Sequence, residues 1–273
     1  TWYPMGGMYK IVEGMTTLAR EQGVTFRYNS SVQKLEMNGS STKGIWTGNS
    51  FEGADYVVAG ADYHHVEQHL VPASFRRYDE AYWNKRVMAP SSLLFYLGLN
   101  KRVKNLLHHT LFFDQDFSVH AKEIYEDPKW PTSPQFYVSC PSKTDESVAP
   151  EGSENILILI PVAPGLHDEE SIREKYFNLV IDRLEKIIDE PIREHIVFKR
   201  SYAHNDFISD YNAFKGNAYG LANTLLQTAN LKPSMVNNKI NNLFYTGQLT
   251  VPGPGVPPSL ISGQVVAKEL IKR

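Results

Sequence analysis

Cysteine is nearly absent from this 273-residue chain, because Cys140 is the only one. No disulfide can therefore form within the chain, and the scarcity favours a reducing compartment. The sequence beside Cys140 shows no arranged histidine and acid, which favours a structural cysteine over a nucleophile. We accordingly expect a cytoplasmic protein.

An excess of charge of either sign is also absent. The chain has 28 Lys and Arg against 30 Asp and Glu, so its formal net charge is −2. The basic residues are scattered, and the densest cluster, 101–104, is more simply explained as a solvated loop than as a lipid-headgroup patch. Nothing offers a nucleic acid an electrostatic footprint, so we exclude a nucleic-acid partner.

Long apolar runs are missing as well. The longest, Ile156 to Val162, is far shorter than the roughly 20 residues that a membrane-spanning helix needs. A spanning helix is therefore excluded. Attachment to the surface of a membrane is not excluded by this observation.

Several familiar catalytic and nucleotide motifs do not occur. The chain lacks the Gly-x-x-x-x-Gly-Lys-Ser/Thr phosphate loop, the Gly-x-Gly-x-x-Gly fingerprint and the Gly-x-Ser-x-Gly elbow of serine hydrolases. His65 and His69 have the i, i+4 spacing of a helical metal pair, but no Glu stands at the metalloprotease position. We expect no metal site.

The elements that are present indicate an α/β chain. Helical spacing of apolar residues predicts a helix over 8–22, and extended patterns predict strands at 24–28 and 54–60. Asn38-Gly39 predicts a tight hairpin turn between them. The succession of helix, hairpin and buried strand is typical of an α/β unit with a β excursion.

The middle of the chain predicts a sheet with helices on one face. Strands are expected at 91–99, 155–162 and 192–202. The clearest helix is 168–189, with Asp168 as its expected N-cap and an apolar stripe that we interpret as core-facing.

The carboxy-terminal third carries the main candidate site. A short strand at 242–247 ends in glycine, a Gly/Pro loop covers 248–258, and a helix follows over 259–272. In α/β folds, ligands bind beyond the carboxyl ends of strands, where a helix N-terminus offers free N–H groups. The pattern is moderately specific, and a merely packed connector is the alternative.

These residues together resemble one family. The run 243–257, LFYTGQLTVPGPGVP, is similar to the carboxy-terminal flavin signature of bacterial-type phytoene desaturases. The runs 206–229 and 3–8 resemble the segments that the same family has before its last strand and at mid-chain. Residues 75–200 add little. The resemblance is thus to the carboxy-terminal half of an FAD-dependent carotenoid desaturase of the amine-oxidase-like superfamily.

The resemblance implies an α/β, or mixed α+β, fold. Part of an FAD-binding Rossmann-like domain is expected at 1–65, with the β-hairpin excursion, and again at 206–273. A substrate-binding domain built on a mixed β-sheet with helices is expected at 66–205. The amino-terminal half of the same protein would be a missing partner, so we expect the chain to be a fragment, and its own binding of FAD is left open.

The resemblance also implies cofactor contacts, residue by residue. Val32 would meet the adenine through its backbone, and Gly60 would end a strand near it. Gly247 would approach the diphosphate or ribityl chain, and Gln248 stands where related flavoproteins often have an acid. The remaining contacts would lie beside the isoalloxazine: Gly255, Val256 and Pro257. No catalytic residue is implied.

The implied activity is the FAD-dependent dehydrogenation of a carotenoid precursor such as phytoene. The partners would be an apolar polyene and a membrane surface, with the complete enzyme peripheral on the inner membrane. Two alternatives stay open: another flavoprotein of the superfamily, retinol saturase-like or amine-oxidising, and a non-catalytic polyene-binding module. One departure is Leu231-Lys232-Pro233, where the family often shows Phe-Arg-Pro, because Lys lacks the bidentate fork of Arg.

Overall fold

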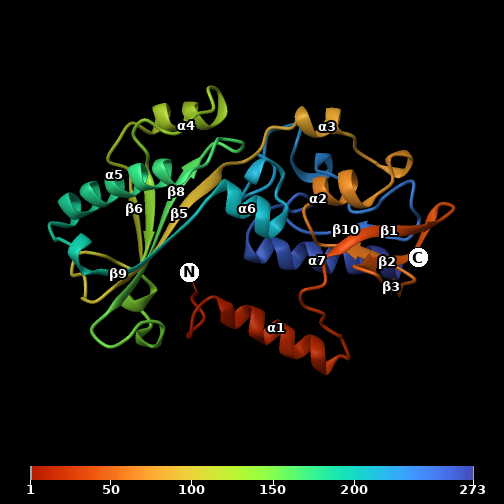
Figure 1. Cartoon of the computed structure of the whole chain (residues 1–273), viewed down its shortest axis with the longest axis horizontal. Coiled ribbons are helices and arrows are strands. Elements are labelled where there is room, and N and C mark those ends of the chain that lie inside the picture. The colour runs from red at the N-terminus through yellow and green to blue at the C-terminus, as the bar shows by residue number, and fades with distance from the viewer. Residues whose placement is uncertain (1, 273) are drawn as a thin grey trace. The chain divides into compact units, whose positions relative to one another are not determined.

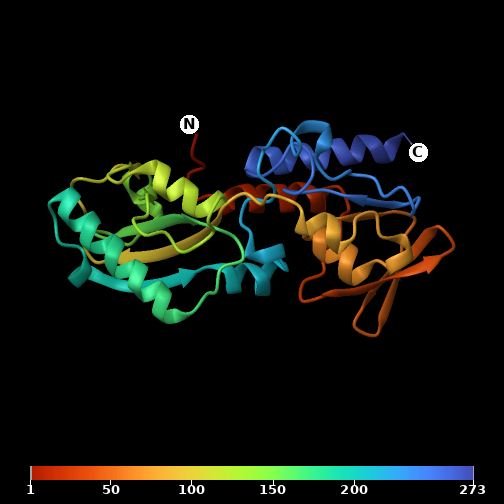
Figure 2. The same ribbon diagram turned by 90° about the horizontal axis from the view of Figure 1, so that it is seen from above.

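The computed structural model describes residues 2–272, which divide into two compact units (Figures 1 and 2). We call unit 1 the set that contains 2–27, 92–162 and 167–203. Unit 2 contains 28–91, 163–166 and 204–272. The chain therefore crosses between the units several times, and each unit is assembled from segments that are distant in the sequence.

Unit 1 is built on a five-stranded sheet in the order β6-β7-β8-β5-β9. Its elements are α1 (Tyr9–Glu21), β5 (Ser91–Leu99), β6 (His109–Phe112), α4 (Phe117–Tyr125), β7 (Phe136–Ser139), β8 (Glu154–Val162), α5 (Glu170–Ile188) and β9 (Ile196–Tyr202). The long strands β5 and β8 were predicted closely from their apolar residues. The predicted strand at 24–28 is wrong, because these residues form a connecting segment outside any ladder.

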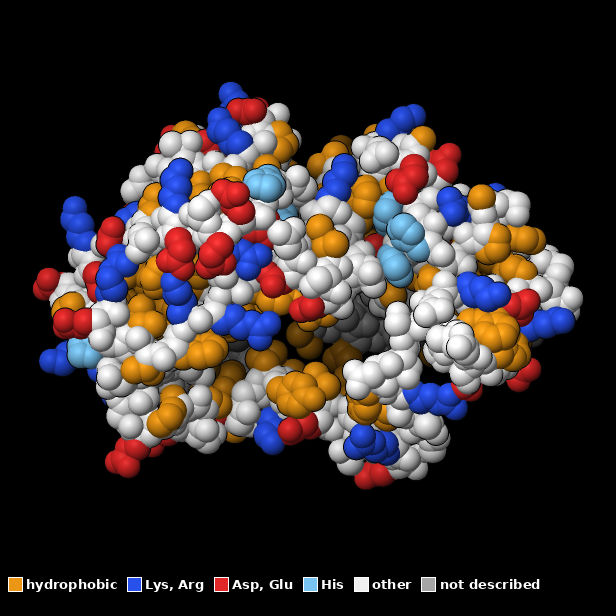
Figure 3. All heavy atoms as spheres, viewed as in Figure 1, with side chains coloured by type: hydrophobic (Ala, Val, Ile, Leu, Met, Phe, Trp, Pro, Cys, Tyr) orange, Lys and Arg blue, Asp and Glu red, His pale blue; other side chains and the backbone are white. Residues whose placement is uncertain are grey.

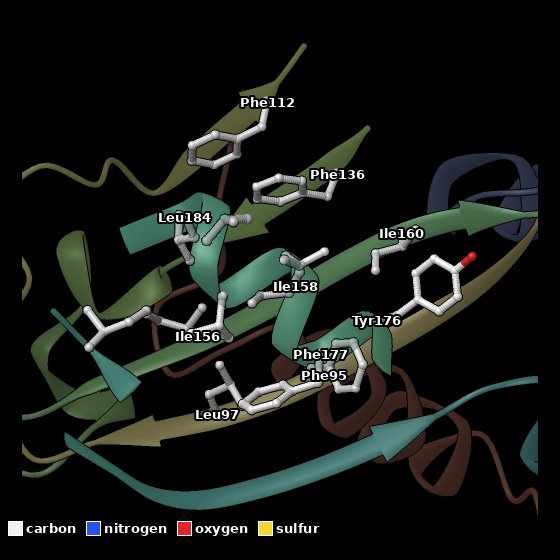
Figure 4. Packing of buried hydrophobic residues seen from close by; sticks show 14 of the residues in the cluster. Phe95, Leu97, Phe112, Phe136, Ile156, Ile158, Ile160, Tyr176, Phe177 and Leu184 are labelled. Atoms are coloured by element: carbon white, nitrogen blue, oxygen red, sulfur yellow. The ribbon is translucent and has the colours of Figure 1, made fainter. Parts of the chain in front are cut away.

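One face of this sheet packs against α5. Along β8 every second residue is buried, as expected when one face of a strand lies against a core. Figure 4 shows Phe177 and Leu184 of α5 lying against Phe95, Ile158 and their neighbours on the strands. Each fully buried side chain of this kind contributes about 1.5–3 kcal/mol relative to exposure. The core-facing interpretation of the helix stripe is therefore confirmed.

The outward face of α5 is charged. In Figure 3, Lys, Arg, Asp and Glu side chains alternate over this part of unit 1, as on a solvated helix face. The predicted cap is wrong: Glu169 occupies the N-cap position, and Asp168 instead forms an ion pair with Arg173, with 2.6 Å between Oδ2 and Nη2. The start of α5 is therefore held by an ion pair between two side chains, and no side chain caps the backbone N–H groups of its first turn.

The other face of the sheet is not covered by α5. Leu111 pairs with Tyr137, and Tyr137 pairs with Leu159, so the three side chains form one cross-strand row on that face. Leu111 is 62% exposed, and Tyr137 and Leu159 are half-buried. An apolar surface therefore runs across the strands of unit 1.

Unit 2 contains two small sheets and four helices among its described residues. Its elements are β1 (Val32–Asn38), β2 (Ser41–Thr47), β3 (Ser50–Gly53), β4 (Val57–Ala59), α2 (Tyr63–His65), α3 (Glu80–Asn84), α6 (His204–Tyr211), β10 (Leu243–Tyr245) and α7 (Val256–Ile271). The sheet β1-β2-β3 contains the predicted hairpin. The helix α7 begins three residues earlier than predicted, and Pro257 lies in its first turn. Proline has no backbone N–H, but the N–H groups of a first turn have no partner within the helix, so no hydrogen bond is lost.

The second sheet of unit 2 is the parallel pair β4 and β10. Leu243 faces Val57 and Tyr245 faces Ala59, although the two strands are far apart in the sequence. Tyr245 stacks on Tyr63 with 3.9 Å between ring centroids, so the first turn after β4 and the last strand share one core. This packing fixes the ends of both strands.

The two units differ from the predicted domains in several segments, two of them long. Residues 2–27 belong with the sheet of unit 1, because Tyr3 packs on His108 at 4.8 Å and the N–H of Gly6 donates to Asp145 at 2.6 Å. Residues 66–91 belong to unit 2, because Val66 and Trp83 are fully buried in its core. The functional labels of the two domains stay predictions. The presence of helices with mixed sheets confirms the α/β class.

Candidate functional site

A cavity of about 370 Å³ opens in unit 2 beyond the carboxyl ends of β4 and β10. Because the strands are parallel, their carboxyl ends meet at one edge, and the residues that follow each strand form the wall. Six of the lining residues matter for the argument: Gly60, Asp62, Asn212, Asn217, Gly247 and Gln248. This is the position where α/β folds bind ligands.

The turn after β10 is held open by its glycine. Gly247 has φ = +107°, a backbone conformation that other residues rarely adopt. A Cβ at this position would lie 3.8 Å from the carbonyl oxygen of Gly60, so the two glycines face each other closely. At these two positions no side chain stands between the backbone and the cavity.

A buried serine of α7 fixes this turn. Ser262 is fully buried, and its hydroxyl oxygen accepts the N–H of Gly247 at 3.0 Å. Its own proton has acceptors in the carbonyl of Ser259 and in the hydroxyl of Thr246, both at 2.8 Å. The first turns of α7 and the end of β10 are thus joined through one side chain.

Asn217 organises the opposite wall. Its side-chain oxygen accepts the N–H of Gly220 at 2.9 Å and the amide of Gln248 at 3.1 Å, and its own amide donates to the carbonyl of Phe214 at 2.8 Å. Gln248 is therefore held by a protein partner rather than left to solvent. Sequence reasoning missed Asn217, although it lies inside the motif run 211–221.

Asp62 places a carboxyl group in the cavity wall. One of its oxygens accepts the N–H of His65 at 3.1 Å, and the other accepts the N–H of Phe214 at 3.2 Å. Burial raises the pKa of Asp62 more than these N–H donors lower it. This side chain joins the turn after β4 to the segment before β10, and no sequence pattern had singled it out.

The predicted cofactor residues divide into three groups. Gly60, Gly247 and Gln248 line the one cavity. Gly255 is the N-cap of α7 with φ = +110°, and Val256 and Pro257 form its first turn. Val32 opens β1 and does not line the cavity. The individual contacts of all seven residues with a cofactor stay predictions.

A second cavity, of about 590 Å³, lies in unit 1 on the face of the sheet that α5 leaves open. Its apolar wall includes Trp2, Met8 and Leu157. His109 also lines the cavity, and its ring stacks on that of Tyr137. Gly7 also lines it. Burial lowers the pKa of the neighbouring His108, which favours its neutral form. The cavity therefore suits an apolar ligand.

The imidazole rings of the histidines near α2 lie close together. They appear together in Figure 3, and the rings of His65 and His69 lie 5.1 Å apart. His64 contacts Glu80 at 3.0 Å. Within residues 2–272, no group of three or more His, Cys, Asp or Glu side chains is placed to hold a metal ion. Cys140 is buried, and burial raises the pKa of its thiol to about 11.

None of the helices in the described part of the chain combines the length and apolar character needed to cross a bilayer. The parallel strand pair and the glycines at its carboxyl edge define the chain as an α/β protein with a cavity at its strand ends. The model of the family "Flavin containing amine oxidoreductase" matches residues 1–271.

Relatives refine this result. The carotenoid 3,4-desaturase of Haloarcula japonica is 40% identical over 271 residues, covering 99% of this chain and 55% of the relative. The zeta-carotene-forming phytoene desaturase of Myxococcus xanthus is 31% identical, covering 99% of this chain and 52% of the relative. The chain thus spans about half the length of these relatives.

A solved structure agrees on the fold. An oxidoreductase from Methanosarcina mazei superposes with a TM-score of 0.67 at 14% identity, over 97% of this chain and 55% of that one. The chain therefore belongs to the flavin containing amine oxidoreductase family, and the relatives that it resembles include carotenoid and phytoene desaturases. The recognition made from the terminal motifs is confirmed.

Proposed function

We propose that the complete protein catalyses the FAD-dependent dehydrogenation of a carotenoid-type polyene. The observation that carries this proposal is the cavity at the carboxyl ends of β4 and β10, with Gly60 and Gly247 side by side in its wall. Similarity to a carotenoid desaturase and a phytoene desaturase supports this reaction class.

The residues present fit a flavin dinucleotide. Gly60 and Gly247 allow close approach to the backbone, and Gly255 places the N-terminus of α7 beside the same loop. Gln248 and Asn217 offer amide groups to a ribityl hydroxyl or a diphosphate oxygen. These residues would hold the cofactor from its carboxy-terminal side.

When bound, FAD would accept a hydride from one carbon of a C–C single bond while the adjacent carbon loses a proton, so that the bond becomes double. The chain contributes orientation and exclusion of water. The Ser262 contacts hold the turn at Gly247 in place, and the apolar walls of unit 1 keep the substrate carbons dry. We assign no catalytic acid or base.

The substrate is proposed to lie on the open face of the sheet of unit 1. The row of Leu111, Tyr137 and Leu159 continues into the cavity lined by Leu157 and Met8. Large apolar side chains in adjacent strands suit a long apolar polyene, which needs contact area rather than polar contacts. Such a substrate dissolves in lipid, so we propose that the complete protein works at a membrane surface. No helix among residues 2–272 could span the bilayer.

An amino-terminal segment is proposed to complete unit 2. Among the described residues, no strand pairs with the second edge of β4, and Val58 on that strand is 43% exposed. A further parallel strand would satisfy the backbone of β4, in keeping with relatives that are about twice as long.

The experiment is a product assay with the protein expressed from its complete gene. The protein is incubated with FAD and an acyclic polyene such as phytoene in liposomes, and the products are separated by chromatography. We expect products with additional conjugated double bonds. An equal incubation with a primary amine, in which only the amine is oxidised, would instead favour the amine-oxidising alternative. Liposomes that float without the protein would contradict its proposed attachment to a membrane surface.

A further inference from the structure

One lysine of unit 2 is buried without a hydrogen-bond partner. Lys232 is 5% exposed and is the only buried lysine among residues 2–272. Its Nζ has no hydrogen-bond partner among the described residues. A buried amine in this condition costs about 1–3 kcal/mol, and more if it is charged. The protein therefore retains an unfavourable group at this position.

The amine lies directly against the Gly/Pro loop. A Cβ built on Gly253 would sit 3.5 Å from both Cε and Nζ of Lys232, so Gly253 leaves the space that the amine occupies. Gly253 has φ = +128°, which favours glycine here for a second reason. The amine therefore lies against the backbone of this loop.

No acid balances this amine. Burial alone lowers the pKa of Lys232, and no carboxylate opposes that effect. The N-terminus of α7, capped by Gly255, contributes further positive potential to the same loop. Two sources of positive potential thus converge on residues 247–255, and nothing in the described chain neutralises them there.

We propose that Lys232 is a positioning residue whose charge stabilises electron density on the cofactor held by the loop 247–255, and so favours the reduced cofactor. This inference rests on the proposed function. A flavin gains two electrons in the reaction, so a cation near its ring binds the reduced form more tightly than the oxidised form. The field acts through the loop and requires no direct contact.

A purely structural lysine would behave differently. The aliphatic part of Lys232 fills space beneath Gly253, and Met fills nearly the same space without the charge. Loss of packing would weaken both cofactor states alike. Loss of charge would weaken only the reduced state. The reduction potential of the bound flavin separates these two cases, because it depends on the ratio of the two affinities.

The test uses the complete gene product loaded with FAD. The midpoint potential of the bound flavin is measured for wild type, K232M, K232Q and K232R, with the exposed K239M as a matched control. We expect K232M and K232Q to lose at least tenfold in the ratio of reduced-form to oxidised-form affinity, which corresponds to a fall of about 30 mV for a two-electron couple. K232R and K239M should stay near the wild-type value.

The outcomes separate the two proposals. Flavin bound to K232M or K232Q at an unchanged potential would overturn the role of Lys232 and leave the proposed function intact. Wild-type protein that binds no flavin would overturn the proposed function and this inference together. Should K232M fail to fold, K232Q gives the same comparison, and a K232R potential as low as that of K232Q would also contradict the role of charge.

Discussion

At the scale of single residues, the positions that shape the cavity in unit 2 are mostly glycines and amides. Gly247 adopts φ = +107° next to Gly60, and Asn217 joins Gln248 to the segment before β10. None of these groups is reactive on its own. Their effect is to bring backbone close to a ligand and to hold it there, which is the role expected of a protein whose cofactor carries the chemistry.

The substitution G247A should weaken flavin binding by at least tenfold. A Cβ at φ = +107° costs about 1–3 kcal/mol of strain and narrows the gap to Gly60. The matched control is G263A in α7, where an added Cβ meets nothing within 4 Å and Ala favours the helix. Binding is measured by titrating FAD into each cofactor-free variant. Equal affinities for G247A and G263A would contradict the close approach at Gly247.

Glu154 should make the free energy of unfolding of unit 1 decrease as the pH falls. Its burial alone would raise its pKa, but the Lys143 ammonium at 2.7 Å and the Ser142 hydroxyl outweigh burial, so the pKa is lowered from 4.5. A depressed folded-state pKa gives stability that is present above the unfolded value and is lost as pH falls through the folded value. The loss should lie between about pH 5 and pH 3.

The matching variant is E154Q, which cannot titrate. We expect it to be less stable than wild type by about 2 kcal/mol at pH 7, and the difference should shrink toward pH 3. Urea unfolding at a series of pH values measures this. A difference that is constant with pH would mean that the charge of Glu154 is not what stabilises this site.

Much at this scale could be predicted from the sequence, and some could not. Gly60, Gly247 and Gln248 were named from the family resemblance, and the structure brings them together around one cavity. Asp62 was not identified, because its carboxylate accepts the N–H of Phe214, 152 residues away in the sequence. Lys232 was noted only as a departure from the family's arginine, and its contact with Gly253 is visible only in the structure. Local pattern does not encode such proximity.

At the scale of elements, periodicity was informative where an element packs on one face only. The helix α5 and the strand β8 show a clean division between buried and exposed residues. Their ends were less predictable: Asp168 is a good capping residue by type, but Arg173 competes for its carboxylate. The segment 24–28 has strand-forming residues and is not a strand, because propensity alone does not provide a ladder.

The contrast within α5 gives a stability prediction. Leu184 is fully buried against the sheet, whereas Ile187, one turn further on, is 47% exposed. L184A should destabilise the protein by about 3 kcal/mol, since it leaves a cavity in the core, and I187A should cost less than about 1 kcal/mol. Thermal unfolding of both variants provides the comparison. Similar losses for the two variants would contradict the packing shown in Figure 4.

At the scale of the whole molecule, each unit has one feature that suits half of the proposed reaction. Unit 2 has the cavity at its strand ends, and unit 1 has the apolar sheet face. The assignment of residues to the units was only partly predictable, because 2–27 and 66–91 join cores that their sequence neighbours do not share. Such exchanges depend on long-range packing, as between Trp83 and Tyr63.

In the proposed function, a bound flavin is reduced with electrons from a polyene. The most direct test is an anaerobic visible absorbance spectrum of the purified complete gene product before and after addition of an acyclic polyene. The account predicts flavin bands that travel with the protein and bleach as the polyene absorption moves to longer wavelength. A protein that shows no flavin bands, even after FAD is added, would contradict it.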